Sequence, residues 1–192
     1  MESKEDSIRT FIAIPAPLSG QLQAARDQLK QRIFTGRVRW ISEPQLHFTL
    51  LFIGETPVAL LKPVASALRE ALGEVSAATL TYKGIGVFGP PHAPRVLWAG
   101  IAEKEILHDI QQRVTGALDP ILALPGSNHF KPHLTLARIK SLPENVRMKE
   151  VIAPYYENEL GEMVLDRVRL YRSELHPQGA RYTVLEEIFL GW

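Results

Sequence analysis

One four-residue pattern (histidine, apolar, threonine, apolar) occurs twice in this chain, at residues 47–50 and again at residues 133–136. Each copy lies in a run rich in residues that favour β-strands, where successive side chains point to opposite faces. The histidine and threonine of each copy therefore share one face, and the two apolar residues share the other. The copies lie 86 residues apart, close to half of the 192-residue chain. The repeat predicts two strands that each present an imidazole beside a hydroxyl, backed by an apolar face.

The composition is that of an ordinary globular protein and excludes several functional classes. Hydrophobic residues make up 45% of the chain and charged residues 22%, and 192 residues suffice for one domain or two packed lobes. The net charge of +1 excludes a broad basic surface, so an anion would have to bind in a local pocket. The absence of cysteine excludes disulfides, thiolate nucleophiles and thiolate metal ligands. The charged first residues and the lack of a long apolar run predict a cytoplasmic protein without a signal peptide or membrane span.

The rest of the sequence predicts an α+β fold. Strands are expected at 8–15, 38–41, 46–53, 77–88, 95–101, 132–137, 160–172 and 181–190, and helices at 18–33, 57–72, 102–118 and, in part, 143–156. Thr56 is the expected N-cap of the second helix, and residues 119–131 are expected to be irregular. Because short turns join neighbouring strands, the sheets should be largely antiparallel. We expect residues 1–192 to form one bilobal domain, in which each lobe contributes one His-x-Thr strand to a shared cleft.

Two imidazoles on facing strands suit the cleavage of a phosphodiester. In-line displacement at phosphorus needs a base that takes a proton from the attacking oxygen and an acid that protonates the departing oxygen on the opposite side. With an unperturbed pKa of about 6.5, one histidine can be neutral and the other protonated around neutral pH. The threonine hydroxyls can donate hydrogen bonds to the phosphate oxygens as negative charge develops. This scheme requires no metal and no other cofactor.

Two other interpretations of the histidines stay open. Either histidine could be a structural residue of its strand, as isolated histidines often are. They could also be metal ligands. Neither motif has a further His, Asp or Glu at ligand spacing, however, so a third ligand would have to come from a distant part of the chain.

Several segments carry a specific resemblance to a known family. The first motif is followed by Phe52-Ile53-Gly54-Glu55, and the second by Ala137-Arg138. Further similarity lies in Arg9–Ile14, Val38–Trp40, Val96–Gly100, Leu170–Ser173 and Gly179–Tyr182. Over nearly its whole length the chain resembles the two-histidine phosphoesterases and, within them, the RNA 2′,3′-cyclic phosphodiesterase family, also called 2′-5′ RNA ligases.

The resemblance implies a pseudo-twofold bilobal fold, in which two mainly antiparallel sheets flank a central cleft and the helices lie outside. It implies hydrolysis of a terminal 2′,3′-cyclic phosphate on RNA to a 2′-phosphate without metal. It also implies the related 2′-5′ ligation, in which an RNA 5′-hydroxyl replaces water. Carried over by position, His47 is the proton donor to the departing 3′-oxygen, and His133 is the proton acceptor that activates water. Thr49 and Thr135 hold the phosphate oxygens.

Two more residues receive roles from the resemblance. Arg138 would bind phosphate, for which a guanidinium is well suited. Strict alternation puts it on the face opposite His133, so a bulge or a strand end must turn it toward the cleft. Phe11 would stack on the terminal base, with a place in the core as the alternative. The expected partner is RNA with a 2′,3′-cyclic phosphate end, such as a tRNA fragment, or a nucleotide; no membrane partner is expected, and the protein should act as a monomer.

Two rival functions remain. The same cleft could belong to a catalytically silent module that binds RNA or a nucleotide. Alternatively, the protein could be a phosphodiesterase that acts on a small cyclic nucleotide or on 2′-5′ oligoadenylate. The intact histidine pair favours catalysis, because binding alone does not need two groups that titrate near neutral pH.

Overall fold

The computed structural model describes residues 7–124, 130–177 and 179–191, and these residues form nine strands and four α-helices. The strands are β1 (Ser7–Pro15), β2 (Arg37–Trp40), β3 (His47–Pro57), β4 (Ala78–Phe88), β5 (Val96–Ile101), β6 (Leu134–Ser141), β7 (Glu159–Leu165), β8 (Arg167–Glu174) and β9 (Arg181–Phe189). The helices are α1 (Gly20–Arg32), α2 (Leu61–Leu72), α3 (Lys104–Leu122) and α4 (Met148–Ile152). Of the stretch expected to be irregular, 125–129 lie outside the described residues.

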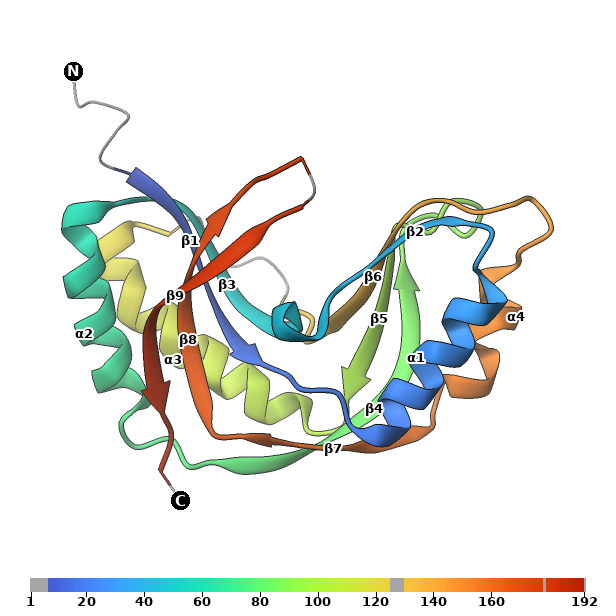
Figure 1. The fold of residues 1–192 in the computed structure, drawn as a ribbon. Helices are drawn as coiled ribbons and strands as arrows, with labels where there is room; N and C mark the ends of the chain where they lie inside the picture. Colours follow the sequence, from blue (N-terminus) through green and yellow to red (C-terminus); the bar gives the residue numbers. More distant parts are fainter. Residues whose placement is uncertain (1–6, 125–129, 178, 192) are drawn as a thin grey trace.

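The nine strands join in one curled, antiparallel sheet (Figure 1). The strand order is β7-β4-β5-β6-β3-β1-β8-β9, with β2 paired to β6. β3 and β6 pair through a single Cα pair, Phe48↔Leu134, and this junction divides the sheet into two halves. We call β1, β3, β8 and β9 the His47 half, and β2, β4, β5, β6 and β7 the His133 half. The predicted α+β fold is confirmed, but the two antiparallel sheets that were expected are the two halves of one continuous sheet.

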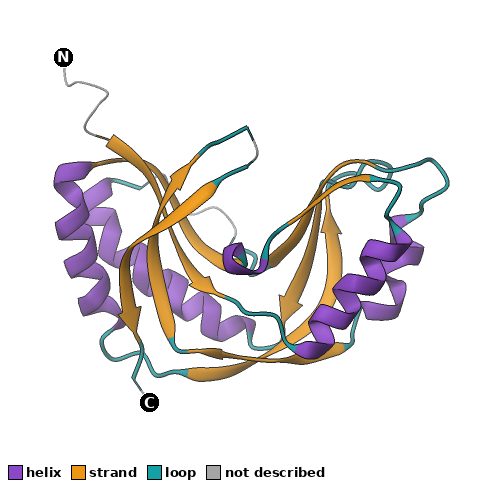
Figure 2. Ribbon diagram, viewed as in Figure 1, coloured by secondary structure: helices purple, strands orange, loops and turns teal. Residues whose placement is uncertain are grey.

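The helices cover the outer face of the curled sheet (Figure 2). α2 and α3 pack on each other, with α3 against β3, while α1 contacts β7 and α4 contacts β4. One face of α1 packs into the core, since Leu22, Ala25 and Leu29 are all buried. Because the helices and the apolar strand residues occupy the outer face, the inner face is left for the polar residues of the motifs.

The first His-x-Thr strand is longer than predicted, and Thr56 is not a helix cap. β3 continues to Pro57 because it pairs with β1 over its whole length, from Pro15↔His47 to Ser7↔Pro57. Thr56 is fully buried in this ladder and shares a 2.6 Å hydrogen bond with the Thr10 hydroxyl. A 3₁₀ turn at 58–60 then leads into α2. Strand pairing thus overrides the local turn composition at 54–57.

Two other boundaries also differ from the prediction. The single strand expected at 160–172 is two strands, β7 and β8, separated at Asp166, where the chain crosses from the His133 half to the His47 half. α3 continues past the expected end at 118 and incorporates Pro120 in its last turn. It stops at Ala123, which adopts a left-handed conformation with a φ of 46°. Within the described ranges, none of the helices combines the length and apolarity that crossing a bilayer requires.

Candidate active site

The two motifs meet at the junction of the two sheet halves. Phe48 and Leu134, which form the joining pair, are fully buried, so His47, Thr49, His133 and Thr135 lie on the opposite, inner face. The predicted alternation is confirmed, because the histidine and threonine of each motif are half-buried while the apolar residues are buried. The antiparallel direction of β3 and β6 places Thr49 on the side of His133 and His47 on the side of Thr135. One point on the inner face therefore gathers two imidazoles and two hydroxyls.

Both imidazole rings make the same contact with the backbone. The Nδ1 of His47 lies 2.7 Å from the carbonyl oxygen of Gln45, and the Nδ1 of His133 lies 2.8 Å from the carbonyl oxygen of Lys131. A carbonyl only accepts hydrogen bonds, so Nδ1 carries the proton in both rings. The reactive nitrogen is then Nε2 in each case, a base when the ring is neutral and an acid when it is charged. The symmetric contact, two residues back in each motif, presents both rings in the same tautomer.

The surroundings of His47 shift its titration. Burial is the largest cause and lowers the pKa of His47 below its ordinary value, and the positive charges of His133 and Arg138 lower it further. The hydrogen bond to Gln45 opposes these effects in part. These effects favour the neutral form of His47. The same charges show that His133 and Arg138 lie within electrostatic reach of His47.

A β-bulge turns Arg138 onto the face that carries Thr135. β6 pairs with β5 through Trp98↔Thr135 and then Leu97↔Ala137, so Leu136 is the extra residue. Leu136 and Ala137 are consecutive and both fully buried, after which Arg138 is exposed. A bulge shifts the alternation by one residue in this way. Arg138 therefore lies on the inner face of the sheet, as its predicted role in binding phosphate requires.

The expected stacking of Phe11 on a base does not fit its position. Phe11 is only 2% exposed, and its ring stacks on Tyr171 at 5.0 Å and meets the edge of Tyr182 at 4.9 Å. It lies 5.1 Å from the ring of His47, and Tyr182 lies 5.4 Å from the same ring. Because these neighbours cover the ring of Phe11, it supports His47 and leaves no face for a ligand. We call Phe11, Tyr171 and Tyr182 the aromatic cage.

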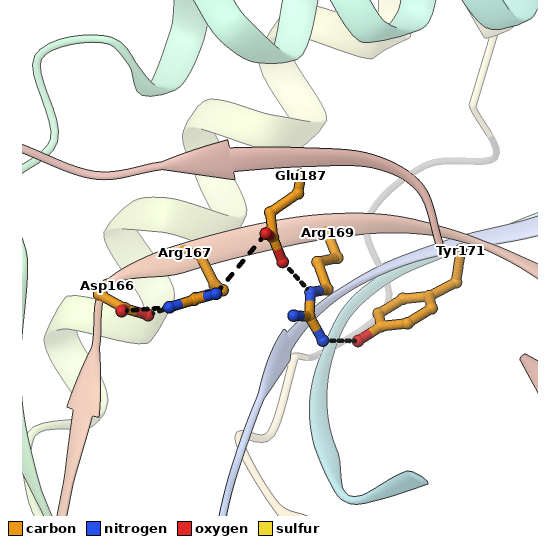
Figure 3. Close-up of polar contacts among 5 residues, drawn as sticks. All are labelled: Asp166, Arg167, Arg169, Tyr171 and Glu187. Carbon is orange, nitrogen blue, oxygen red and sulfur yellow. Dashed lines mark hydrogen bonds and ion pairs between the residues drawn. The ribbon is translucent and has the colours of Figure 1, made fainter. Parts of the chain in front are cut away.

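A chain of polar contacts holds Tyr171, one member of this cage, in position (Figure 3). Arg169 donates to the hydroxyl of Tyr171 at 3.4 Å and to the carboxylate of Glu187 on the neighbouring strand. Glu187 lies 3.5 Å from Arg167, which pairs with Asp166 through two hydrogen bonds of 2.7 Å. These bonds to Arg167 lower the pKa of the Asp166 carboxyl. The network fixes Tyr171, and through it Phe11 and His47.

Sequence reasoning did not assign Tyr171, Tyr182 or the Arg169 network to the site. Tyr171 reaches the cage through pairing of β8 with Phe11 on β1, and Tyr182 through pairing of β9 with β8. The available signal was that both tyrosines lie in segments that resemble the family, Leu170–Ser173 and Gly179–Tyr182. Which strands lie beside β1 is decided by tertiary pairing, which no local pattern encodes.

The turn between β8 and β9 contacts the segment before His47 and strand β2, and so links the aromatic cage to the His133 half. Gln45 donates a 2.7 Å hydrogen bond to the carbonyl of Ala180, and the carbonyl of Gln45 itself holds His47. Gly179 has a φ of +123° and lies so close to Arg39 of β2 that an added Cβ would overlap the guanidinium. The positive φ favours glycine at this position, whereas the guanidinium is the end of a flexible side chain that can move aside.

The ring of His133 has fewer aromatic neighbours than the ring of His47. Phe88 meets the ring of His133 edge-on at 4.9 Å and lies 5.2 Å from Trp98. The other described histidines lie away from this point: His92 and His176 are exposed in loops, and His108 on α3 contacts Phe130. In the described part of the chain, no three His, Asp or Glu side chains cluster where they could bind a metal ion.

Comparison with known proteins agrees with this geometry. The sequence model of the 2′-5′ RNA ligase superfamily matches residues 14–177, which include both motifs. The chain belongs to the 2′-5′ RNA ligase superfamily. It is 34% identical to a Thermus thermophilus protein named RNA 2′,3′-cyclic phosphodiesterase, over 95% of this chain and 90% of that one. A protein of the same name from Methanothermobacter thermautotrophicus is 29% identical, over 93% of this chain and 97% of the relative.

Solved structures show the same fold. The crystal structure of TT0787 from Thermus thermophilus matches with a TM-score of 0.77 and 28% identity, covering 95% of this chain and 98% of the other. The Escherichia coli LigT structure in complex with 3′-AMP matches with a TM-score of 0.69 and 22% identity, covering 97% and 99%. The expected two-histidine phosphoesterase fold is therefore confirmed.

Proposed function

We propose that this protein hydrolyses the 2′,3′-cyclic phosphate at the end of an RNA to a 2′-phosphate, with His47 and His133 as its acid–base pair. The enzyme class follows from relatives of that name that match over most of the chain at about 30% identity. The observation that carries the mechanism is the matched presentation of the two rings, each with Nδ1 bound to a backbone carbonyl and Nε2 left for the substrate. We further propose that the two halves form one bilobal unit, each supplying one motif.

The phosphate would lie between the two Nε2 atoms. Neutral His133 takes a proton from a water molecule that attacks phosphorus, and cationic His47 protonates the departing 3′-oxygen. Thr49 and Thr135 donate hydrogen bonds to the non-bridging oxygens, and Arg138 compensates the negative charge. No step in this scheme uses a metal.

The lowered pKa of His47 bears on its role as the donor. In the empty site, burial and the charges of His133 and Arg138 favour neutral His47. The bound phosphate brings a negative charge that favours the cationic ring. His47 is therefore expected to acquire its proton together with the substrate, so that the acid is charged when the phosphate is in place.

The test is hydrolysis of a synthetic RNA with a 2′,3′-cyclic phosphate end in the presence of a chelator. The wild-type protein should release a 2′-phosphate, identified by chromatography against 2′- and 3′-phosphate standards. His47→Ala and His133→Ala should each lower the rate by roughly 10²–10⁴-fold, the usual contribution of a general acid or base. His92→Ala, which alters an exposed loop histidine, is the matched control and should keep full activity. Metal-dependent turnover, or full activity in either motif variant, would contradict the proposal.

A further inference from the structure

Arg39 and Arg138 lie directly opposite each other on neighbouring strands. They are Cα partners in the antiparallel pairing of β2 and β6, and the adjacent pair is Trp40↔Ala137. Both arginines are exposed, whereas Ala137 is fully buried and Trp40 packs against the core. Because neighbours along a strand point to opposite faces, the two arginines share the inner face. Their backbones lie about 5 Å apart, as in any antiparallel pair.

The protein leaves the charges of these two arginines uncompensated. Within the described residues, no carboxylate oxygen lies within 4.0 Å of either guanidinium. The His47 half differs, because Arg167 and Arg169 are both paired with carboxylates. Like charges directly opposite each other on paired strands are destabilising. A ligand with more than one negative charge would offset this repulsion.

Arg39 lies on the side of β6 that faces the His47 half. The edge of β6 that joins β3 continues along β2, while β5 occupies the opposite edge. The guanidinium of Arg39 lies against Gly179 in the turn between β8 and β9. The same turn accepts a hydrogen bond from Gln45, whose own carbonyl holds His47. A ligand that extends from the phosphate site past His47 therefore meets Arg39.

The chemistry of the substrate identifies the group that arrives there. Opening of a 2′,3′-cyclic phosphate expels the 3′-oxygen of the terminal ribose, and in the proposed mechanism His47 protonates this oxygen. The terminal ribose then lies on the His47 side of the cyclic phosphate. In an RNA, the 5′-oxygen of this ribose carries the next phosphate. A 2′,3′-cyclic mononucleotide has a free 5′-hydroxyl at the same place and no second phosphate.

We propose that Arg39 binds the phosphate on the 5′ side of the terminal nucleotide, so that the site selects RNA ends over 2′,3′-cyclic mononucleotides. This inference rests on the proposed function, in which Arg138 already compensates the cyclic phosphate. A guanidinium suits the task because it can bind a phosphate through two parallel hydrogen bonds. The contacted phosphate does not react, so Arg39 contributes to binding and leaves the chemical step to the histidines. Arg39 is a specificity residue in this account.

The experiment compares three substrates that differ only on the 5′ side. They are adenosine 2′,3′-cyclic phosphate, the same compound with a 5′-phosphate, and the adenylate dinucleotide with a 2′,3′-cyclic phosphate end. The wild type should show a KM about tenfold lower for the second and third substrates than for the first, because a hydrogen-bonded charge pair is gained. Steady-state kinetics of hydrolysis measure these values.

Arg39→Ala should remove this advantage. KM for the second and third substrates should rise by about tenfold with little change in kcat, and kcat/KM for the first substrate should stay within about twofold of the wild type. The unchanged first substrate also shows that the variant is folded. Arg39→Lys keeps the charge but loses the paired hydrogen bonds, so its KM should fall between the two. Arg113→Ala, which alters an exposed arginine of α3, is the matched control and should keep all three values.

Three results would overturn the inference. Equal losses on all three substrates would place Arg39 at the cyclic phosphate itself. Equal KM values in the wild type would show that the second phosphate is not bound. An advantage confined to the dinucleotide would assign the selection to the second nucleoside. A wild type that hydrolyses none of the three would refute the proposed function, and the inference with it.

Discussion

His47 and His133 make the same type of contact with the backbone, but the side chains that surround the two rings differ. Each ring binds the carbonyl two residues before it through Nδ1. Around His47 the cage of Phe11, Tyr171 and Tyr182 encloses the ring, and burial lowers its pKa. His133 meets Phe88 alone among the aromatic rings of the described residues, and Phe88 lines a groove of about 950 Å³.

The difference shows that a repeated motif can keep its backbone contact while the packing around it diverges. The shared contact presents Nε2 identically in both halves, so the motif alone cannot distinguish the acid from the base. The packing behind each ring supplies the distinction. In the proposed mechanism the closely packed ring of His47 is the acid, and the more open ring of His133 is the base.

The largest expected effect comes from opening the cage. Phe11→Ala removes a buried ring that has four aromatic neighbours, and it should cost about 3–5 kcal/mol of unfolding free energy. Phe88→Ala, the matched change on the open side, should cost less than half of that because Phe88 is only half-buried. Urea unfolding of both variants measures the two values. Equal losses would mean that the two rings are supported alike.

The second effect is the loss of hydrolysis rate when the hydroxyl of Thr49 or Thr135 is removed. Thr49→Val and Thr135→Val keep the side-chain shape but remove one donor to the phosphate, and each should lower the rate of hydrolysis on the order of 10²-fold. Single-turnover rates on the cyclic-phosphate RNA measure this. Thr79→Val, on the exposed side of β4, serves as the control and should leave the rate unchanged. Activity retained in both motif variants would remove the threonines from the mechanism.

The third effect is the rise in KM for the RNA when Arg138 is replaced. Replacement by alanine removes a positive charge from the phosphate site, so KM for the RNA should rise by about tenfold while kcat changes less. Arg147→Ala is the control, because that side chain is 79% exposed and forms only a long pair with Glu150. Steady-state kinetics distinguish the two variants. An unchanged KM in Arg138→Ala would show that the bulge does not bring this arginine to the substrate.

The smallest effect is the dependence of stability on pH. The pKa of His47 in the folded protein lies below the 6.5 of the free side chain, so between these values the unfolded chain binds more protons. This contribution to stability is present above about pH 6.5 and is lost as the pH falls toward the folded pKa. His47→Gln should therefore make the loss of melting temperature on acidification shallower. Parallel curves for the two proteins would contradict the assigned shift.

The part of the site that is local in sequence could be predicted. Alternation put His47 and Thr49 on one face and Phe48 and Leu50 on the other, and burial confirms this. The need for a bulge before Arg138 was also foreseeable, and the adjacent apolar residues Leu136 and Ala137 are its sequence trace. These features depend only on near neighbours in the chain.

The features that could not be predicted from the sequence depend on which strands pair with each other. Phe11 is enclosed because β8 pairs with β1, which brings Tyr171 onto it, and this burial favours the core position over the predicted contact with a base. Thr56 was expected to cap a helix because its neighbours are turn-forming residues, yet pairing with β1 extends the strand through it. Long-range pairing overrides local propensity at both positions.

The most direct test of the account is the pH dependence of kcat/KM for hydrolysis of the cyclic-phosphate RNA. If one histidine must be neutral and the other protonated, the profile is bell-shaped around neutral pH in the wild type. His133→Ala should then lose the acidic limb, because no base remains to be deprotonated, and His47→Ala should lose the alkaline limb. A flat wild-type profile between about pH 5 and pH 8 would contradict a pair of acid–base histidines.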